Sequence, residues 1–268
     1  MQSVGRSWDD VEIARIFRSS VRSSEPALAE SALAMAAVIR LAMVDAGFPT
    51  GRHDATSGAD DRVGDDQFDM VGQLARLDEL AASVETPTAT GVFRTLFDSG
   101  RFRGDTLDYY DPRNSFLDEV LDRGVGIPIT LSVLMIEVAA RVGVDVRGVG
   151  LPGHFVVGEL DGVARVPARF FDPFHGGAIL DADGCRALVS RLAGGPVVIP
   201  SEAWYPSSNL SIIERMLNNQ KAYWMALTRT GDLSAATVLG AVMWARSCLP
   251  HIGDRERGEW MRAIAPLN

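Results

Sequence analysis

Apolar side chains recur at helical spacing in the first part of the chain. The clearest helix is predicted between Pro26 and Gly47, because proline suits the first turn of a helix and glycine suits its C-terminal cap. Helical spacing returns over 68–84 and, more briefly, over 91–102. Further helices are predicted near the end of the chain, over 207–228, 233–248 and 254–264.

The middle of the chain carries the densest pattern. Ser115 and Asp118 have the spacing of a capping box, which predicts the start of a helix that Gly124 and Gly126 then end. A new helix is predicted to begin at Pro128, where a missing N–H group costs nothing. Its apolar face has the spacing of a buried stripe and consists of Leu131, Leu134, Val138 and Val142.

After this helix the pattern changes to the alternation that is typical of strands. Pro-Gly and Asp-Gly pairs mark turns between the alternating segments. Strands are predicted over 144–150, 154–159 and 168–172, and a helix over 181–192. Helices on both sides of a short antiparallel sheet predict an α+β fold.

Charge and composition narrow the class of protein. The chain has 268 residues, of which 47% are hydrophobic, and a net charge of −9. It can bury a substantial core, while an acidic surface repels nucleic-acid phosphates and anionic lipids. We therefore expect neither nucleic acid nor a membrane as a partner. The first residues are charged throughout and lack the apolar core of a signal peptide, so we expect a cytoplasmic protein.

Metal ligands are not evident from residue spacing. Cys185 and Cys248 form neither a disulfide framework nor a metal-binding pattern. The segment 50–69 contains six aspartates but lacks the alternate spacing and the closing glutamate of a calcium loop. We expect this segment to be a solvated loop, and we expect no metal and no cofactor.

One histidine and one aspartate have the order of a catalytic pair. His154 begins a predicted strand and Asp172 ends a later one, so adjacent antiparallel strands would bring them together. In a Cys–His–Asp hydrolase or acyltransferase the imidazole takes the proton of the nucleophile, and the carboxylate fixes the imidazole tautomer. The nucleophile is expected at a helix N-terminus, where the helix dipole favours an anion. That helix begins at Pro128, which cannot be a nucleophile.

Several motifs in one order carry a resemblance to a known family. The chain resembles the SirB-type branch of the transglutaminase-like superfamily, which shares the architecture of papain-like cysteine proteases. The match covers roughly residues 25–230. The motifs are LARLDEL at 74–80, YDPRNSFLDEVL at 110–121, GIPITLSVL at 126–134, PGHF at 152–155, DPFHGG at 172–177 and IERMLNN at 213–219.

The resemblance implies a fold and a set of site residues. The catalytic cysteine of active relatives carries over to Pro128, the histidine to His154 and the aspartate to Asp172. The SirB-type branch commonly lacks the cysteine; the chain departs from that branch at His175, where asparagine is more usual. The implied organisation is a loosely ordered arm at 1–24, a transglutaminase-like domain with N-terminal helices at 25–205, and a tetratricopeptide-like helical tail at 206–268.

Each of these residues also has a structural interpretation. His154 and Asp172 can form a buried pair without catalysis, and His175 is expected at the surface of a turn. Asn114, Pro128 and Thr130 are expected to line the cleft. The hydroxyl of Thr130 could replace the missing thiol or cap the helix; Ser132 could likewise replace the thiol or pack within the helix. Cys185 is expected to be a helix residue away from the pair.

Two functions from different classes remain open. One is a non-catalytic module that binds a protein or peptide, which the missing nucleophile and the helical tail favour. The other is a hydrolase or acyltransferase that uses His154 and Asp172 with a hydroxyl or water. The identity of a partner or substrate does not follow from the sequence, because one fold hosts many functions.

Overall fold

The computed structural model describes residues 7–50, 68–160, 165–176 and 178–252. The chain forms two compact units, of which the first combines Met1–Met70 with Ile213–Asn268 and the second is Val71–Ile212. This division differs from the expected boundaries at 24 and 205, because the helices at the two ends of the chain belong to one unit.

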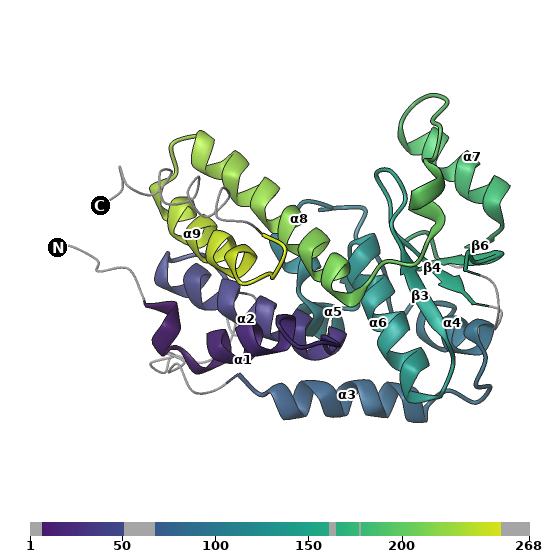
Figure 1. The fold of residues 1–268 in the computed structure, drawn as a ribbon, viewed down its shortest axis with the longest axis horizontal. Coiled ribbons are helices and arrows are strands. Elements are labelled where there is room, and N and C mark those ends of the chain that lie inside the picture. The colour runs from purple at the N-terminus through teal and green to yellow at the C-terminus, as the bar shows by residue number, and fades with distance from the viewer. Residues whose placement is uncertain (1–6, 51–67, 161–164, 177, 253–268) are drawn as a thin grey trace. The chain divides into compact units, whose positions relative to one another are not determined.

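The first unit is helical (Figure 1). It contains α1 (Glu12–Val21), α2 (Leu28–Asp45), most of α8 (Asn209–Arg229) and α9 (Leu233–Ser247). Helix α2 is apolar on nearly every side, so it needs neighbours on more than one face. Helices α1 and α9 both pack against it.

The N-terminal segment is part of this unit and corrects one expectation. Ala14, Phe17 and Val21 are fully buried at the three-to-four-residue spacing of an amphipathic helix. The ring of Trp8, in a short 3-10 helix (η1, Trp8–Asp10), lies 5.8 Å from the ring of Trp244. The predicted loosely ordered arm is therefore wrong for residues 7–24.

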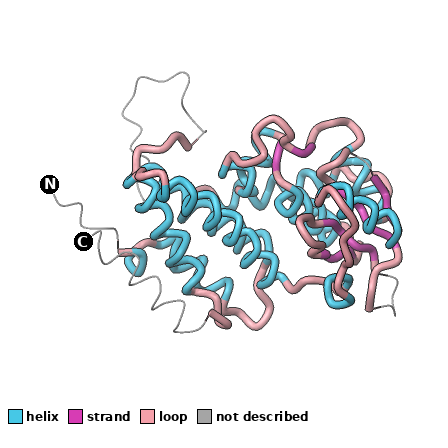
Figure 2. The backbone as a smooth tube through the Cα atoms, turned by 90° about the horizontal axis from the view of Figure 1, so that it is seen from above, coloured by secondary structure: helices cyan, strands magenta, loops and turns pink. Residues whose placement is uncertain are grey.

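The second unit places helices around a four-stranded sheet. Its strands are β3 (Val146–Val149), β4 (Val156–Glu159), β5 (Arg169–Asp172) and β6 (Ala178–Leu180), which pair antiparallel in that order. Figure 2 shows these strands grouped among the helices of this unit. Three predicted strands are thereby confirmed, whereas β6 was not predicted.

Other elements of the second unit lie around the sheet. Helix α6 packs on β3 and β4, and α7 packs on β5 and β6. A two-stranded parallel ladder joins β1 to β2. The bounds of these elements are α3 (Met70–Ala82), α4 (Ala89–Phe97), β1 (Arg103–Gly104), η2 (Pro112–Ser115), α5 (Leu117–Arg123), β2 (Val125–Gly126), α6 (Pro128–Arg141), α7 (Ala182–Leu192) and η3 (Ser201–Trp204).

Helix α6 is the centre of the second unit. It begins at Pro128 as predicted, and Leu131, Leu134 and Val138 are fully buried. Gly143 has a φ of 74°, a left-handed conformation that suits glycine after the end of a helix.

The predicted capping box is wrong. Ser115 belongs to η2, and α5 begins two residues later, at Leu117, without a side-chain cap. The local cap is made instead by Asp111, whose carboxylate accepts a hydrogen bond from the backbone N–H of Arg113. The predicted helix over 254–264 and nearly all of the acidic segment 50–69 lie outside the described residues.

Among the residues that the structure describes, no helix combines the length and the apolar character needed to cross a bilayer.

We expect alanine at Leu134 or Val138 to lower the free energy of unfolding by about 1–4 kcal/mol, because each truncation leaves a cavity in a fully packed core. Urea unfolding of each variant measures the change. The control is Val71→Ala on the exposed side of α3, which should change stability by less than about 0.5 kcal/mol. Equal stability of all three variants and the parent would contradict the central position of α6.

Candidate functional site

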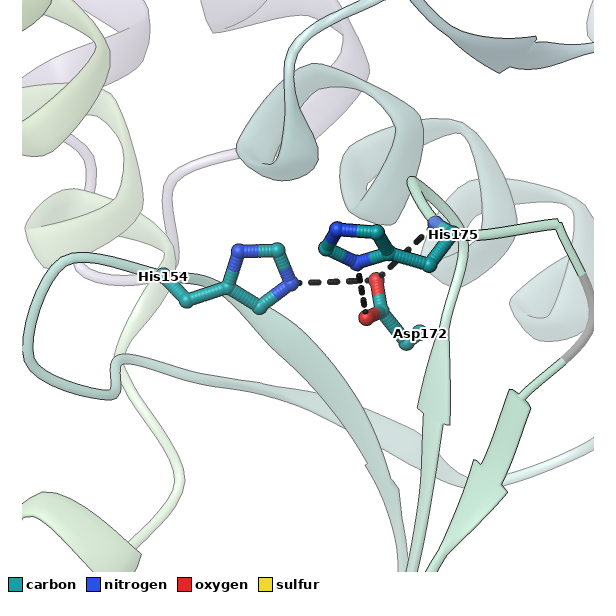
Figure 3. Close-up of side chains that lie close together, drawn as sticks. All are labelled: His154, Asp172 and His175. Carbon is teal, nitrogen blue, oxygen red and sulfur yellow. Dashed lines mark hydrogen bonds and ion pairs between the residues drawn. The ribbon is translucent and has the colours of Figure 1, made fainter. Parts of the chain in front are cut away.

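The carboxylate of Asp172 joins two imidazoles at one end of the sheet (Figure 3). Its Oδ1 lies 3.0 Å from Nε2 of His154, and its Oδ2 lies 2.6 Å from Nδ1 of His175. The backbone N–H groups of Phe174 and His175 also donate to Oδ1, at 3.1 and 3.4 Å. His154 and Asp172 are buried, while the side chain of His175 is 31% exposed.

Strand register explains why these residues meet. Strands β4 and β5 pair antiparallel with Val157 opposite Phe171, so the start of β4 lies beside the end of β5. His154 precedes β4, and Asp172 is the last residue of β5. The turn that follows Asp172 bends back and brings His175 over the carboxylate, because the Asp172 side chain accepts from the turn amides. The expected contact between His154 and Asp172 is present.

The Asp172 carboxylate is held in its charged form. Burial by itself raises the pKa of Asp172, but the hydrogen bonds and charges of His154 and His175 outweigh burial and place the pKa well below its usual range. An ionised carboxylate only accepts hydrogen bonds, so both imidazole nitrogens that face it must carry protons. The other ring nitrogen of His154, Nδ1, lies on the far side of the ring from Asp172 (Figure 3).

Phe174 lies between the site and the β1 region. Its ring centre is 6.3 Å from that of His154 and 5.7 Å from that of Tyr109, both in edge-on geometry. A Cβ atom added at Gly104 would come within 2.5 Å of the Phe174 carbonyl oxygen and 2.6 Å of its ring. Glycine at 104 therefore allows β1 to lie directly against the turn that carries His175.

His175 is the site residue whose role sequence reasoning missed. Its expected surface position agrees with its partial exposure, but its bond to Asp172 was not foreseen. The available signal was the spacing Asp-Pro-Phe-His, since a turn after a strand can return the fourth residue over the first. The three side chains together offer two imidazole nitrogens and one carboxylate oxygen, all within 4.8 Å of one another.

Comparison with known proteins places this site in a family. The family model for the transglutaminase-like superfamily matches residues 69–218, which is more than half of the chain. The chain belongs to the transglutaminase-like superfamily. Both His154 and Asp172 lie in the matched region.

Individual relatives match a shorter stretch. A UPF0162 protein of Xylella fastidiosa is 39% identical over 135 residues, which are 48% of this chain and 46% of the relative. UPF0162 protein PA3419 of Pseudomonas aeruginosa is 30% identical over 154 residues, or 56% of this chain and 53% of the relative. F-box only protein 21 of Mus musculus is 30% identical over 130 residues, which are 46% of this chain and 20% of the relative. The matches thus span about half of these UPF0162 proteins and a fifth of the F-box protein.

The expected cleft residues of this superfamily member are buried. Asn114 is enclosed, and its Nδ2 donates to Oδ2 of Asp105 at 3.1 Å and to the carbonyl of Asp108 at 2.7 Å. Pro128 is buried at the first turn of α6. All three expected cleft residues, Asn114, Pro128 and Thr130, are thus buried, and their lining of a cleft stays a prediction.

Neither helix hydroxyl reaches the imidazole. Ser132 donates its hydroxyl to the carbonyl of Pro128 at 2.8 Å, which confirms its role in helix packing. Thr130 is fully buried, and its Oγ1 has no hydrogen-bond partner among the described residues, so it is not a helix cap. Neither hydroxyl is placed to replace a thiol next to His154.

Both cysteines are buried. Burial raises the pKa of the Cys185 thiol to about 12, and the charge of Asp172 adds to the shift. The side chain of Cys185 packs in an apolar cluster with Val149, Val156 and Phe170. Burial also raises the pKa of Cys248. A thiol that stays protonated is a poor nucleophile.

We expect the stabilisation contributed by Asp172 to be lost in acid. Its pKa is lower in the folded protein than the unfolded value of about 3.9, so the stabilisation is complete above that value and falls as the pH drops further. Urea unfolding at pH 5 and at several lower values should show the parent more stable than Asp172→Asn at pH 5, with a gap that narrows below about pH 4. Asp183→Asn, which removes an exposed carboxylate, is the control. A gap that stays constant at every pH would refute the depressed pKa.

Proposed function

We propose that this chain is a SirB-type member of the transglutaminase-like superfamily that lacks the catalytic cysteine and binds a protein or peptide without catalysis. One observation carries the proposal. The resemblance carries the nucleophile of active relatives onto Pro128, which is buried at the start of α6, and both thiols of the chain are buried with raised pKa values.

An exposed apolar loop supplies a binding surface beside the site. Leu107 is 98% exposed and Tyr110 is 78% exposed, and the ring of Tyr109 contacts both Tyr110 and Phe174. Aromatic side chains are enriched in protein interfaces because they bury much apolar surface with few rotatable bonds. We call residues 105–111 the aromatic loop.

The aromatic loop is held by buried polar groups. Oδ1 of Asp105 accepts from the backbone N–H groups of Leu107 and Asp108, and Asn114 donates to Asp105 and to the Asp108 carbonyl. Burial raises the pKa of Asp105, but the hydrogen bonds and Arg123 lower it overall, which keeps the acceptor charged. A loop fixed in this way loses less conformational entropy when a partner binds.

The helical tail extends the proposal. Helix α9 follows α8 in the chain after a turn at Gly231, and the tetratricopeptide-like tail that the resemblance implies would add a further binding surface. The resemblance also implies a papain-like architecture for the sheet and α6. Papain-like domains hold extended chains, so this architecture supports a peptide or protein as the bound partner.

A second candidate is a hydrolase or acyltransferase that uses His154 and Asp172 with water. Asp172 fixes the tautomer in which Nε2 of His154 carries the proton, so Nδ1 is the nitrogen that could accept one. The hydrogen bond between His154 and Asp172 is therefore the observation that favours the hydrolase or acyltransferase.

We expect cysteine-directed electrophilic probes to leave the folded protein unlabelled, because both thiols are buried and protonated. Mass spectrometry of the intact protein measures the labelling. Protein unfolded in urea, which should label at both cysteines, is the control for probe reactivity. Stoichiometric labelling of folded protein at Cys185 that disappears in His154→Ala would overturn the non-catalytic proposal.

We expect serine at both Leu107 and Tyr110 to abolish partner binding while leaving the thermal midpoint unchanged, because both side chains face solvent. The measurement is recovery of a specific protein from an extract of the native cells, with purified parent and variants as bait. Val198→Ser, which removes another exposed apolar side chain of the second unit, is the matched control and should retain the partner.

Two results would contradict the binding proposal. One is equal recovery by the parent, the double variant and the control. The other is hydrolysis or acyl transfer on a peptide substrate that is lost in His154→Ala, which would favour the enzyme candidate.

A further inference from the structure

We propose that His154, Asp172 and His175 bind a divalent transition-metal ion of the zinc class. The three donor atoms, two imidazole nitrogens and one carboxylate oxygen, lie within 4.8 Å of one another. Figure 3 shows both imidazoles directed at the same carboxylate. Two histidines and one carboxylate are a recurrent ligand set for zinc and for iron(II) in proteins.

The two oxygens of Asp172 have different surroundings, which identifies the metal-binding atom. Oδ1 accepts from His154 and from the backbone N–H groups of Phe174 and His175, whereas within the described residues Oδ2 accepts only from His175. We assign Oδ2 as the ligand. Oδ1 then keeps its backbone bonds and holds the carboxylate in orientation, as outer hydrogen bonds do at established metal sites.

Small movements would convert the present hydrogen bonds to metal bonds. In a tetrahedral zinc site with bonds of about 2.0–2.1 Å, neighbouring donor atoms lie about 3.3 Å apart. At present Nδ1 of His175 lies 2.6 Å from Oδ2, and Nε2 of His154 lies 3.0 Å from the neighbouring Oδ1. His175 must therefore move slightly away from Oδ2, while Nε2 of His154 turns toward it.

The proton balance is also satisfied. The ion takes the place of the protons now on Nε2 of His154 and Nδ1 of His175. Each neutral imidazole can carry its proton on its other nitrogen, so both remain neutral ligands.

Exposure gives the ion a route and an open coordination position. His154 and Asp172 are buried, whereas His175 is partly exposed, so the ion enters from the His175 side. Three protein ligands leave the fourth tetrahedral position for water or another ligand. The imidazole pair favours zinc, cobalt or nickel over magnesium and calcium, which prefer sites built from oxygen.

A second histidine–carboxylate pair provides a matched comparison. Nε2 of His251 lies 2.7 Å from Oε2 of Glu214 on the protein surface. It has no third ligand that completes a metal-binding group within the described part of the chain. A metal effect that depends on the complete three-residue set should therefore be absent there.

The test uses the untagged full chain after treatment with a chelator. Calorimetric titration with zinc should show one saturable site, and titration with cobalt(II) should give the visible absorption bands of a four-coordinate ion. His175→Asn keeps a hydrogen-bonding side chain beside Asp172 but removes the imidazole ligand. It should fold like the parent and lower the zinc affinity at least about tenfold, since even the loss of an outer hydrogen bond at a metal site costs that much.

His251→Ala is the matched control and should bind zinc as the parent does. Asp172→Asn, which removes the ligand charge, should weaken binding like His175→Asn; circular dichroism checks that both fold. Absence of saturable zinc and cobalt binding by the parent would overturn the proposal, as would equal affinity of the parent and a folded His175→Asn variant. Neither result bears on partner binding through the aromatic loop, so this proposal and the proposed function fail separately.

Discussion

The second unit depends on how it satisfies one buried charge. The carboxylate of Asp172 is 1% exposed, and a buried ionised group is costly unless it is paired and hydrogen-bonded. Two imidazoles and two turn amides meet this requirement. The amides fix the turn after β5, while His154 fixes where the chain enters β4. Satisfying the charge therefore requires the same strand register that builds the site, so sheet and site geometry are set together.

A second buried carboxylate organises the neighbouring surface in the same way. Asp105 follows β1 and accepts bonds from two loop amides and from Asn114. Gly104, directly before it, lets the backbone touch Phe174 in the His175 turn. Two consecutive residues thus connect the aromatic loop to the histidine site: Asp105 holds the loop through hydrogen bonds, and Gly104 lies against the turn that carries His175. Exposed apolar side chains are presented on a backbone that buried hydrogen bonds hold in place, which is how rigid scaffolds position binding loops.

The features that could be predicted from sequence were those that local patterns decide. Pro128 marked the start of α6, alternation marked three strands, and the strand order placed His154 beside Asp172. The failures depended on tertiary packing. The apolar residues of segment 7–24 form a weak pattern in the sequence, and their burial becomes evident only when they pack in the folded unit. Ser115 does not cap a helix, because it lies in a 3-10 helix that Asp111 caps. Strand β6 is three residues long and carries too little pattern to detect.

Burial explains the presence of His154 at the site better than it explains that of His175. Removing one partner of a buried charge pair costs about 3–5 kcal/mol, so packing alone can account for His154 beside Asp172. His175 is different, because its side chain is partly exposed and Asp172 would still have His154 and two amides without it. Burial therefore does not require an imidazole at 175, and a shorter amide side chain could make the same hydrogen bond. An imidazole differs from an amide at this position in its charge, which helps to lower the pKa of Asp172, and in its strength as a metal ligand. Replacing His175 with asparagine therefore keeps the hydrogen bond and removes both of these properties.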